Sequence, residues 1–135
     1  MSPIPPIWQE ERTISWLDVD LLGRLRPQTL FAYLLDAASN HAQGSVYSYE
    51  ELAARNLKWV MLKLQLVIRQ QPRWGERVTV QTWGKRIERL YALRDFAVRS
   101  ASGEKLVSGT SAWLIVAAVL LIGLIYLRLV RTEAQ

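Results

Sequence analysis

The chain has 135 residues, of which 50% are hydrophobic and 21% are charged, a balance typical of one folded globular domain. It has no cysteine and one histidine, which excludes disulfide bonds, thiolate metal sites, a cysteine nucleophile and a multi-histidine metal site within one chain. We expect no cofactor. The formal net charge of +5 favours a partner with an acidic surface.

The first third of the chain predicts a strand followed by a long helix. Residues 1–7 are rich in proline and lack a basic segment or a long apolar run, so we expect an extended lead-in and not a secretory signal. Polar and apolar residues alternate from Trp8 to Leu17, which predicts a strand. A helix is predicted from about residue 27 to 43, with Pro27 in its first turn and an apolar stripe of Leu30, Phe31, Leu34, Leu35, Ala38 and Ala42.

A short second helix and then a change of period follow. Ser48 and Glu51 have the spacing of a capping box, which predicts a helix ending near residue 55 or 56. The next segment alternates with a period of two and predicts a strand with one continuous apolar face, made by Val60, Leu62, Leu64, Leu66 and Ile68.

Three more strands are predicted around 78–83, over 91–100 and from 105 to about 116, with Ser102 and Gly103 in a hairpin turn. We expect the last four strands to pair in chain order as an antiparallel meander. The predicted fold class is α+β, with one long helix on one face of an antiparallel sheet of about five strands.

The end of the chain is unusually apolar. Residues 112–127 contain 16 apolar residues in a row, or about 24 Å as a helix, whereas a bilayer core is about 30 Å thick. A membrane span would have to include 108–111 and would remove the last strand from the sheet. We expect instead that the tail packs on the domain or on a partner subunit and that the protein is cytoplasmic. Membrane association through 112–127 is the alternative.

Three stretches in order carry a family resemblance: 15–27 with 33–42, 57–64 with 72–83, and 87–96 with 110–114. Together they resemble the amino-terminal half of the acyl-acyl carrier protein (acyl-ACP) thioesterases of bacteria and plants. The resemblance covers about residues 8–116. It implies a hot-dog fold, in which a curved antiparallel sheet wraps the long helix, and a protein of fatty-acid metabolism that hydrolyses or binds fatty acyl thioesters.

Full-length members resemble two hot-dog domains in tandem, and their recognised catalytic residues belong to the second. We therefore interpret 1–7 as a lead-in, 8–116 as a single hot-dog domain and 117–135 as an apolar tail with a basic end. Two interpretations stay open: an altered or truncated gene product, or a single domain that forms a homodimer or a higher hot-dog oligomer. The alternative to a hydrolase is a non-catalytic acyl-binding or dimerisation module.

Three residues are candidates for catalysis. Asp20-Leu-Leu-Gly23 is similar to an Asp-x-x-Gly segment of single-domain hot-dog thioesterases, in which helix-start N–H groups can polarise the thioester carbonyl and the carboxylate can activate water. Arg24-Leu-Arg26 departs from the His-Val-Asn that often follows. Asp20 is otherwise a turn residue. Asn40 and His41, at the helix end, are the other candidates, and a hydrogen-bonded structural histidine is the alternative.

The substrate-binding candidates are glycine, tryptophan and arginine. Trp59 and Trp83 are expected either to line an acyl pocket or to be core or dimer contacts. Gly23 is a further candidate for substrate binding. Arg73 and Arg77 belong to a basic cluster that suits acyl carrier protein or a coenzyme A thioester, with a solvated basic rim as the alternative. We do not expect nucleic-acid binding, because aromatic stacking platforms do not accompany the basic residues.

Overall fold

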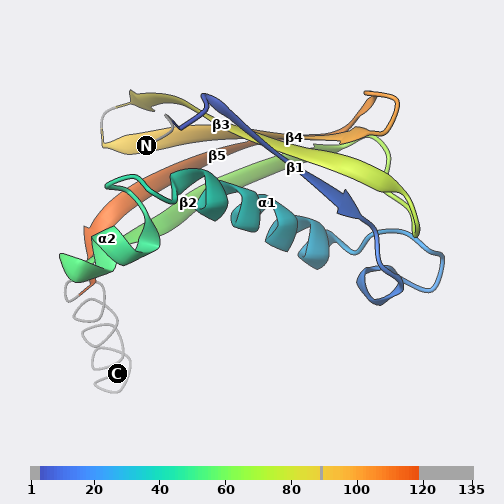
Figure 1. Cartoon of the computed structure of the whole chain (residues 1–135), viewed down its shortest axis with the longest axis horizontal. Coiled ribbons are helices and arrows are strands. Elements are labelled where there is room, and N and C mark those ends of the chain that lie inside the picture. The colour runs from blue at the N-terminus through green and yellow to red at the C-terminus, as the bar shows by residue number, and fades with distance from the viewer. Residues whose placement is uncertain (1–3, 89, 119–135) are drawn as a thin grey trace, which may run out of the picture.

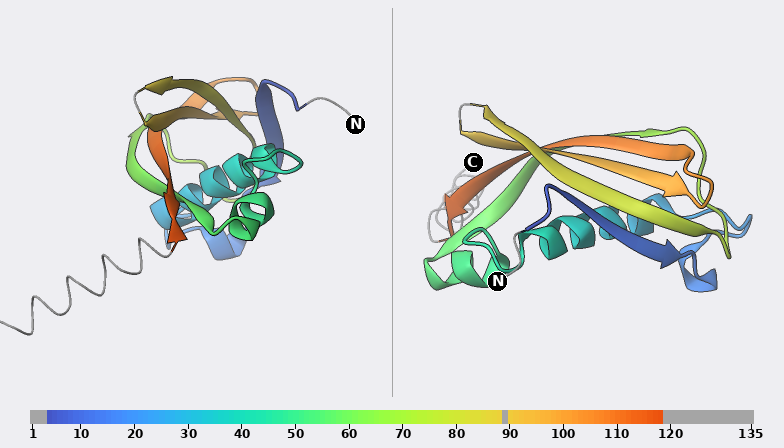
Figure 2. Two further views of the ribbon diagram at one scale, coloured as in Figure 1. Left: turned by 90° about the vertical axis from the view of Figure 1, so that its left-hand side faces the viewer. Right: turned by 45° about the horizontal axis from the view of Figure 1, so that its top comes forward.

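Residues 4–88 and 90–118 are described by the computed structural model of this chain, and they form one curved antiparallel sheet along which a long helix lies (Figure 1). The elements are β1 (Ile7–Thr13), the 3-10 helix η1 (Trp16–Asp18), α1 (Pro27–Ala42), α2 (Tyr49–Ala54), β2 (Leu57–Ile68), β3 (Arg77–Glu88), β4 (Tyr91–Ser100) and β5 (Lys105–Ala117). The turned views show the sheet curling around α1 (Figure 2). The predicted α+β hot-dog fold is confirmed.

The strand order is β1-β3-β4-β5-β2, and all pairs are antiparallel. The predicted meander of the last four strands is therefore wrong in one part, because β2 pairs with β5 and not with β3. Residues 69–76 connect β2 to β3, too many for a tight hairpin. They cross the end of the sheet and bind the segment before α1, since the N–H groups of Leu25 and Trp74 donate to Pro72 and Gly23 across these two segments at 2.8 and 2.9 Å.

The predicted continuous apolar face of β2 is also wrong. The register against β5 shifts between Met61 and Lys63, so that Leu62 lies in a bulge and is 50% exposed. Such an extra residue exchanges the two faces of a strand. Leu64 and Leu66 pack against the core after the bulge, whereas Trp59 precedes it and is paired with Ile115.

Strand β1 ends earlier than the predicted Leu17. Ile14 is buried, and its N–H still donates to the carbonyl of the opposite residue Glu76 at 2.9 Å, after which the chain leaves the sheet and enters η1. Ser15 then caps η1 by accepting from the N–H of Leu17. The boundaries of β4 and the turn at Gly103, which has a φ of 89°, agree with the prediction.

The two helices begin and end close to the predicted residues. Pro27 occupies the first turn of α1, and Ser48 caps α2 by accepting from the N–H of Glu51. One apolar face of α1 packs against the inward residues of the central strands. The core consists chiefly of Leu30, Leu34, Ala37, Val80, Phe96 and Val98. Each large apolar side chain buried there stabilises the fold by about 1.5–3 kcal/mol.

Most of the predicted tail, and residues 1–3 of the predicted lead-in, lie outside the described residues. As far as Ala117, the apolar run continues β5 as a strand. Over residues 4–88 and 90–118, the helices are too short or too polar to cross a membrane.

Candidate functional site

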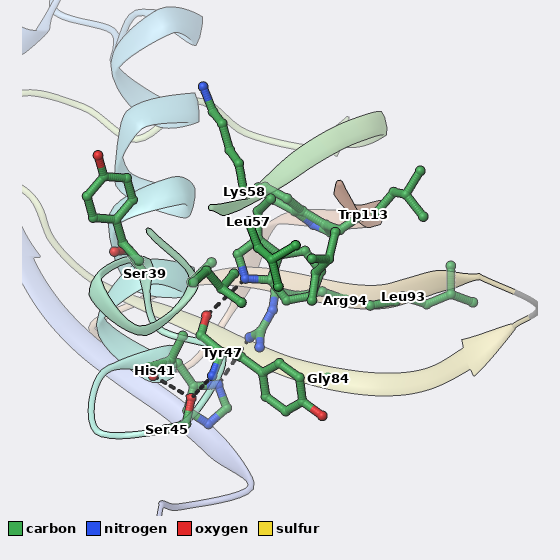
Figure 3. A pocket seen from close by; sticks show the side chains of 18 of the residues that line it. Ser39, His41, Ser45, Tyr47, Leu57, Lys58, Gly84, Leu93, Arg94 and Trp113 are labelled. Atoms are coloured by element: carbon green, nitrogen blue, oxygen red, sulfur yellow. Dashed lines mark hydrogen bonds between the residues drawn. The ribbon is translucent and has the colours of Figure 1, made fainter. Parts of the chain in front are cut away.

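A pocket of about 890 Å³ lies between the C-terminal half of α1, α2 and the ends of the sheet strands (Figure 3). Its position follows from the strand pairing. The ladder between β4 and β5 stops at Ala92 and Trp113, but β5 remains paired with β2 as far as Ala117, and β3 with β4 as far as Tyr91. The sheet therefore opens into two arms, visible in Figure 1, and the pocket lies between them.

Small side chains keep the pocket open. Ala38 and Ala42 of α1 and Ala92 of β4 face it, so that α1 brings little volume to this end of the molecule. Larger apolar residues line the arms, among them Leu57 and Ile115. An apolar hollow with a few polar groups is the usual form of a small-molecule site, and this volume is near the upper end of the range of about 300–1,000 Å³.

His41 and Arg94 form the polar end of the pocket. His41 is buried in the last turn of α1, and its Nε2 lies 2.6 Å from the carbonyl oxygen of Pro5. Since a carbonyl can only accept, Nε2 carries the proton, and Nδ1 accepts from Nη1 of Arg94 at 3.1 Å. The same Nη1 donates to Oγ1 of Thr82 at 3.0 Å, and the ring of Trp8 stacks on His41.

The residues predicted from the sequence do not include Arg94, although its position in β4 carries a signal. The inward positions of β4 are Ala92, Arg94, Phe96 and Val98, so one charged residue interrupts an apolar face. Desolvation by burial lowers the pKa of the Arg94 guanidinium. The hydrogen-bond partners of Arg94, His41 and Thr82, are distant from it in the sequence.

Two tryptophans form the apolar wall of the pocket. Trp59 and Trp113 contact each other edge to face, with ring centroids 6.3 Å apart. The indole Nε1 of Trp59 donates to the carbonyl of Tyr47 at 3.0 Å, and that of Trp113 donates to Oγ of Ser111 at 2.8 Å. Both polar atoms are thus satisfied. Of the residues proposed from the sequence, Trp59 and His41 line this pocket.

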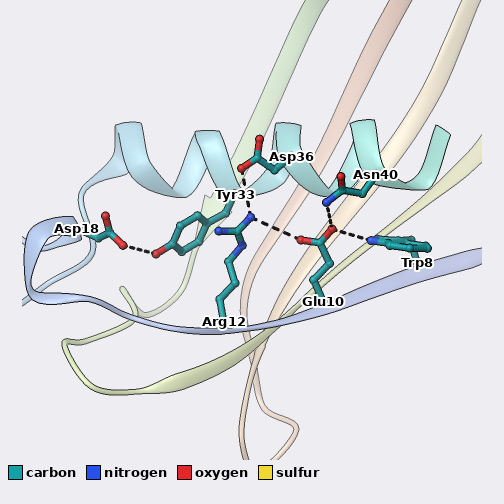
Figure 4. A network of polar contacts seen from close by, with 7 residues as sticks. All are labelled: Trp8, Glu10, Arg12, Asp18, Tyr33, Asp36 and Asn40. Atoms are coloured by element: carbon teal, nitrogen blue, oxygen red, sulfur yellow. Dashed lines mark hydrogen bonds and ion pairs between the residues drawn. The ribbon is translucent and has the colours of Figure 1, made fainter. Parts of the chain in front are cut away.

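Asn40 neighbours His41 but takes part in a different network, which joins β1 to α1 (Figure 4). Its Nδ2 donates to Oε1 of Glu10, which also accepts from Nε1 of Trp8. Farther along, Arg12 pairs with Asp36 at 3.2 Å, and its guanidinium lies over the ring of Tyr33. The side chain of Asn40 is therefore engaged in holding the edge strand against the helix.

Asp20 lies before α1, at the opposite end of the helix from His41. Its Oδ1 accepts from the N–H groups of Leu22 and Arg24 at 2.9 and 3.0 Å, and its Oδ2 accepts from Nε of Arg24 at 3.2 Å. The backbone hydrogen bond from Arg24 is the main cause that lowers the pKa of this carboxyl. Gly23, with a φ of 74°, completes the turn. These contacts are those of a turn-forming aspartate.

The remaining predicted binding residues lie away from the pocket. Arg73 forms an isolated bridge with Arg24, and Arg77 pairs loosely with Glu11 at 3.9 Å, both at the α1 N-terminal end of the sheet. Trp83 faces the outer side of the sheet, where it borders a smaller hollow of about 320 Å³. Arg89, which the sequence places in the same basic cluster as Arg73 and Arg77, lies outside the described residues. In the described ranges, no group of three or more potential metal ligands is found.

The fold and the pocket define a hot-dog domain with an apolar pocket. The chain belongs to the family described as "Acyl-ACP thioesterase N-terminal domain", whose model matches residues 6–118. The resemblance noted in the sequence is thus confirmed. The catalytic roles of Asp20, Asn40 and His41 stay predictions.

Similar proteins are thioesterases of plants and bacteria. A chloroplastic palmitoyl-acyl carrier protein thioesterase of Gossypium hirsutum is 33% identical over 64% of this chain and 22% of that protein. The crystal structure of an acyl-ACP thioesterase from Bacteroides thetaiotaomicron has a TM-score of 0.79 at 29% identity, over 84% of this chain and 46% of that one. A DHNA-CoA thioesterase from Staphylococcus aureus, at 15% identity, shares the fold with a TM-score of 0.75 over 83% of this chain and 75% of that one. The chain spans about a quarter or less of the curated relatives.

Proposed function

We propose that this chain acts on long-chain fatty acyl thioesters, and that its pocket between α1, α2 and the two arms of the sheet holds the acyl chain. The observation that carries the proposal is this apolar pocket, walled by Trp59 and Trp113, in a member of the acyl-ACP thioesterase family. The proposed reaction is hydrolysis of the thioester to a fatty acid and a free thiol.

The proposed substrate carriers are acyl carrier protein and coenzyme A. The net charge of +5 supports an acidic carrier through electrostatic attraction. Arg73 and Arg77 are exposed and distant from the pocket, so we assign them to carrier docking and not to contact with the acyl chain. Charge reversal of both residues should slow association with the acyl carrier protein most strongly at low salt.

We propose that the domain comprising residues 8–116 works beside a second hot-dog domain, supplied by another copy of the chain in a homodimer. The matched family model describes an amino-terminal domain, which supports pairing with a further hot-dog domain. Sedimentation equilibrium of the purified chain tests this assembly. A monomer at all concentrations would contradict it. We also propose that the protein is cytoplasmic, and fractionation of expressing cells tests this location.

A non-catalytic acyl-binding module is the second candidate, and a specific observation favours it. Asp20 and His41 flank opposite ends of α1, whose intervening residues span roughly 20 Å at about 1.5 Å per residue. Within one chain, these two side chains therefore cannot act on the same thioester carbonyl.

The two candidates are separated by measuring thiol release from hexadecanoyl-ACP and hexadecanoyl-CoA. Hydrolysis by the wild-type chain above that of an Asp20→Asn variant supports catalysis through this carboxylate. Protection of the acyl chain without thiol release supports the binding module. Absence of both activities would contradict the proposed function.

A further inference from the structure

The inference concerns Arg94, the cation at the inner polar end of the pocket. Both acceptors of its Nη1, Nδ1 of His41 and Oγ1 of Thr82, are uncharged. Within residues 4–88 and 90–118, no carboxylate lies within ion-pair distance of this guanidinium. The adjacent Asp95 pairs with Lys85 at 3.5 Å, and successive residues of a strand point to opposite faces.

The other edge of the guanidinium is available to a ligand. Nε and Nη2 of Arg94 donate no hydrogen bond to the described part of the chain. Among these residues, the side-chain polar atoms that are both fully buried and without a hydrogen-bond partner are Arg12 Nε and Asp95 Oδ1. Nε and Nη2 of Arg94 are not among them, so this edge of the guanidinium is not fully buried. Since Arg94 lines the pocket, this edge can be reached from it (Figure 3).

An Nε–Nη2 edge has the geometry that binds a carboxylate with two parallel hydrogen bonds. Burial of a charge is unfavourable unless the charge is paired, so a partly buried arginine without an acid favours an anionic ligand. The surrounding wall is apolar, with Trp113 and Leu114 close by in β5. A ligand that satisfies both features carries one carboxylate and a long apolar chain.

We propose that the pocket binds a free long-chain fatty acid, with its carboxylate on the Nε–Nη2 edge of Arg94 and its chain along Trp59 and Trp113. This inference rests on the proposed function, because a fatty acid is the product of the proposed hydrolysis. A thioester carbonyl is uncharged and accepts weaker hydrogen bonds than a carboxylate. The domain therefore holds the acid more tightly than the ester and is inhibited by its product.

The test compares hexadecanoic acid with its methyl ester, at about pH 8 so that the acid is ionised. Binding is followed by the fluorescence of the pocket tryptophans. Wild-type protein should bind the acid about tenfold or more tightly than the ester. Arg94→Met should remove this difference between acid and ester. Arg99→Met is the matched control on the outward face of the same strand, where Arg99 donates to Gln81, and it should retain the preference.

Each outcome distinguishes the inference from the proposed function. Equal binding of acid and ester by wild type, or an unchanged preference in Arg94→Met, overturns the inference but leaves chain binding intact. Failure of wild type to bind either ligand contradicts the proposed function. If free coenzyme A displaces the acid, Arg94 binds a phosphate and the inference is wrong. If Arg94→Met does not fold, the neutral variant Arg94→Gln replaces it, and a preference undiminished in that variant also overturns the inference.

Discussion

Nη1 of Arg94 donates to Nδ1 of His41 at 3.1 Å and thereby links the central strand β4 to the last turn of α1. This bond lies at the boundary between two parts of the interior. On one side, Phe96 and Leu34 belong to a packed core, and on the other the pocket begins. The pair ties the helix end to the sheet at the edge of the pocket.

Replacing His41 by alanine should lower the free energy of unfolding by about 1–3 kcal/mol, because it leaves the Nη1 donor of Arg94 and the Pro5 carbonyl with fewer partners. Urea denaturation measures the change. The control is Gln43→Ala, an exposed side chain just past the same helix, which should be neutral. A loss no larger than that of the control would show that this histidine does not hold the helix end.

Replacing Tyr33 by phenylalanine should change how stability depends on pH. The hydroxyl of Tyr33 donates to Asp18 at 2.6 Å, and burial, followed by this hydrogen bond, raises the pKa of Tyr33 to about 12 from 10.0. The folded state thus favours the protonated phenol. The protonated phenol stabilises the fold fully below pH 10, and this contribution is lost as the pH rises toward 12. Denaturant titrations should show the wild-type advantage over Tyr33→Phe, of about 2 kcal/mol, shrinking across this range. A constant difference would be inconsistent with a raised pKa.

Asp20→Ala should loosen the turn before α1, because its carboxylate accepts from two backbone N–H groups. Hydrogen exchange at the amides of Leu22 and Arg24 should become faster. Asp20→Asn retains an oxygen acceptor at this position and should preserve much of the protection. Since hydrogen bonding lowers the pKa of Asp20 from 3.8, the wild-type protection should persist at neutral pH and decline only as the pH falls below that value. Equal exchange in all three proteins would argue against the turn role.

Gly109→Ala should destabilise the sheet by about 1–3 kcal/mol. An added Cβ at Gly109 would lie 2.7 Å from Cδ2 of Leu66, a side chain packed against the core. Gly84→Ala is the matched strand control, because its Cβ would meet nothing within 4 Å. Thermal unfolding followed by circular dichroism compares the two. Similar melting temperatures would mean that Leu66 moves aside at little cost.

Local elements could be predicted from the sequence because their causes are local. The spacing of apolar residues after Pro27 is sufficient for α1, and Ser48 with Glu51 is sufficient for the start of α2. The strand order could not be predicted, because β2 and β5 are paired through residues far apart in the chain, such as Leu66 and Gly109. The bulge at Leu62 leaves no clear mark in an apolar run.

The site was predicted in part for the same reason. Residue type alone indicates Trp59 and His41 as site candidates, and both line the pocket. Arg94 was missed because its partner His41 is 53 residues away, and because alternation alone does not tell whether an inward arginine is paired. Similarity to a motif makes Asp20 a candidate, but in the structure its oxygens accept hydrogen bonds from the turn.

The central claim is that the pocket between the two arms of the sheet holds an acyl chain. Calorimetric titration with a non-hydrolysable thioether analogue of hexadecanoyl-CoA tests it in Ala92→Trp, which fills the pocket from β4, against Ala53→Trp on the exposed side of α2. We predict saturable binding by wild type and by Ala53→Trp, and binding weakened at least about tenfold in Ala92→Trp, provided that both variants melt like the wild type. Undiminished binding by a folded Ala92→Trp would contradict the account.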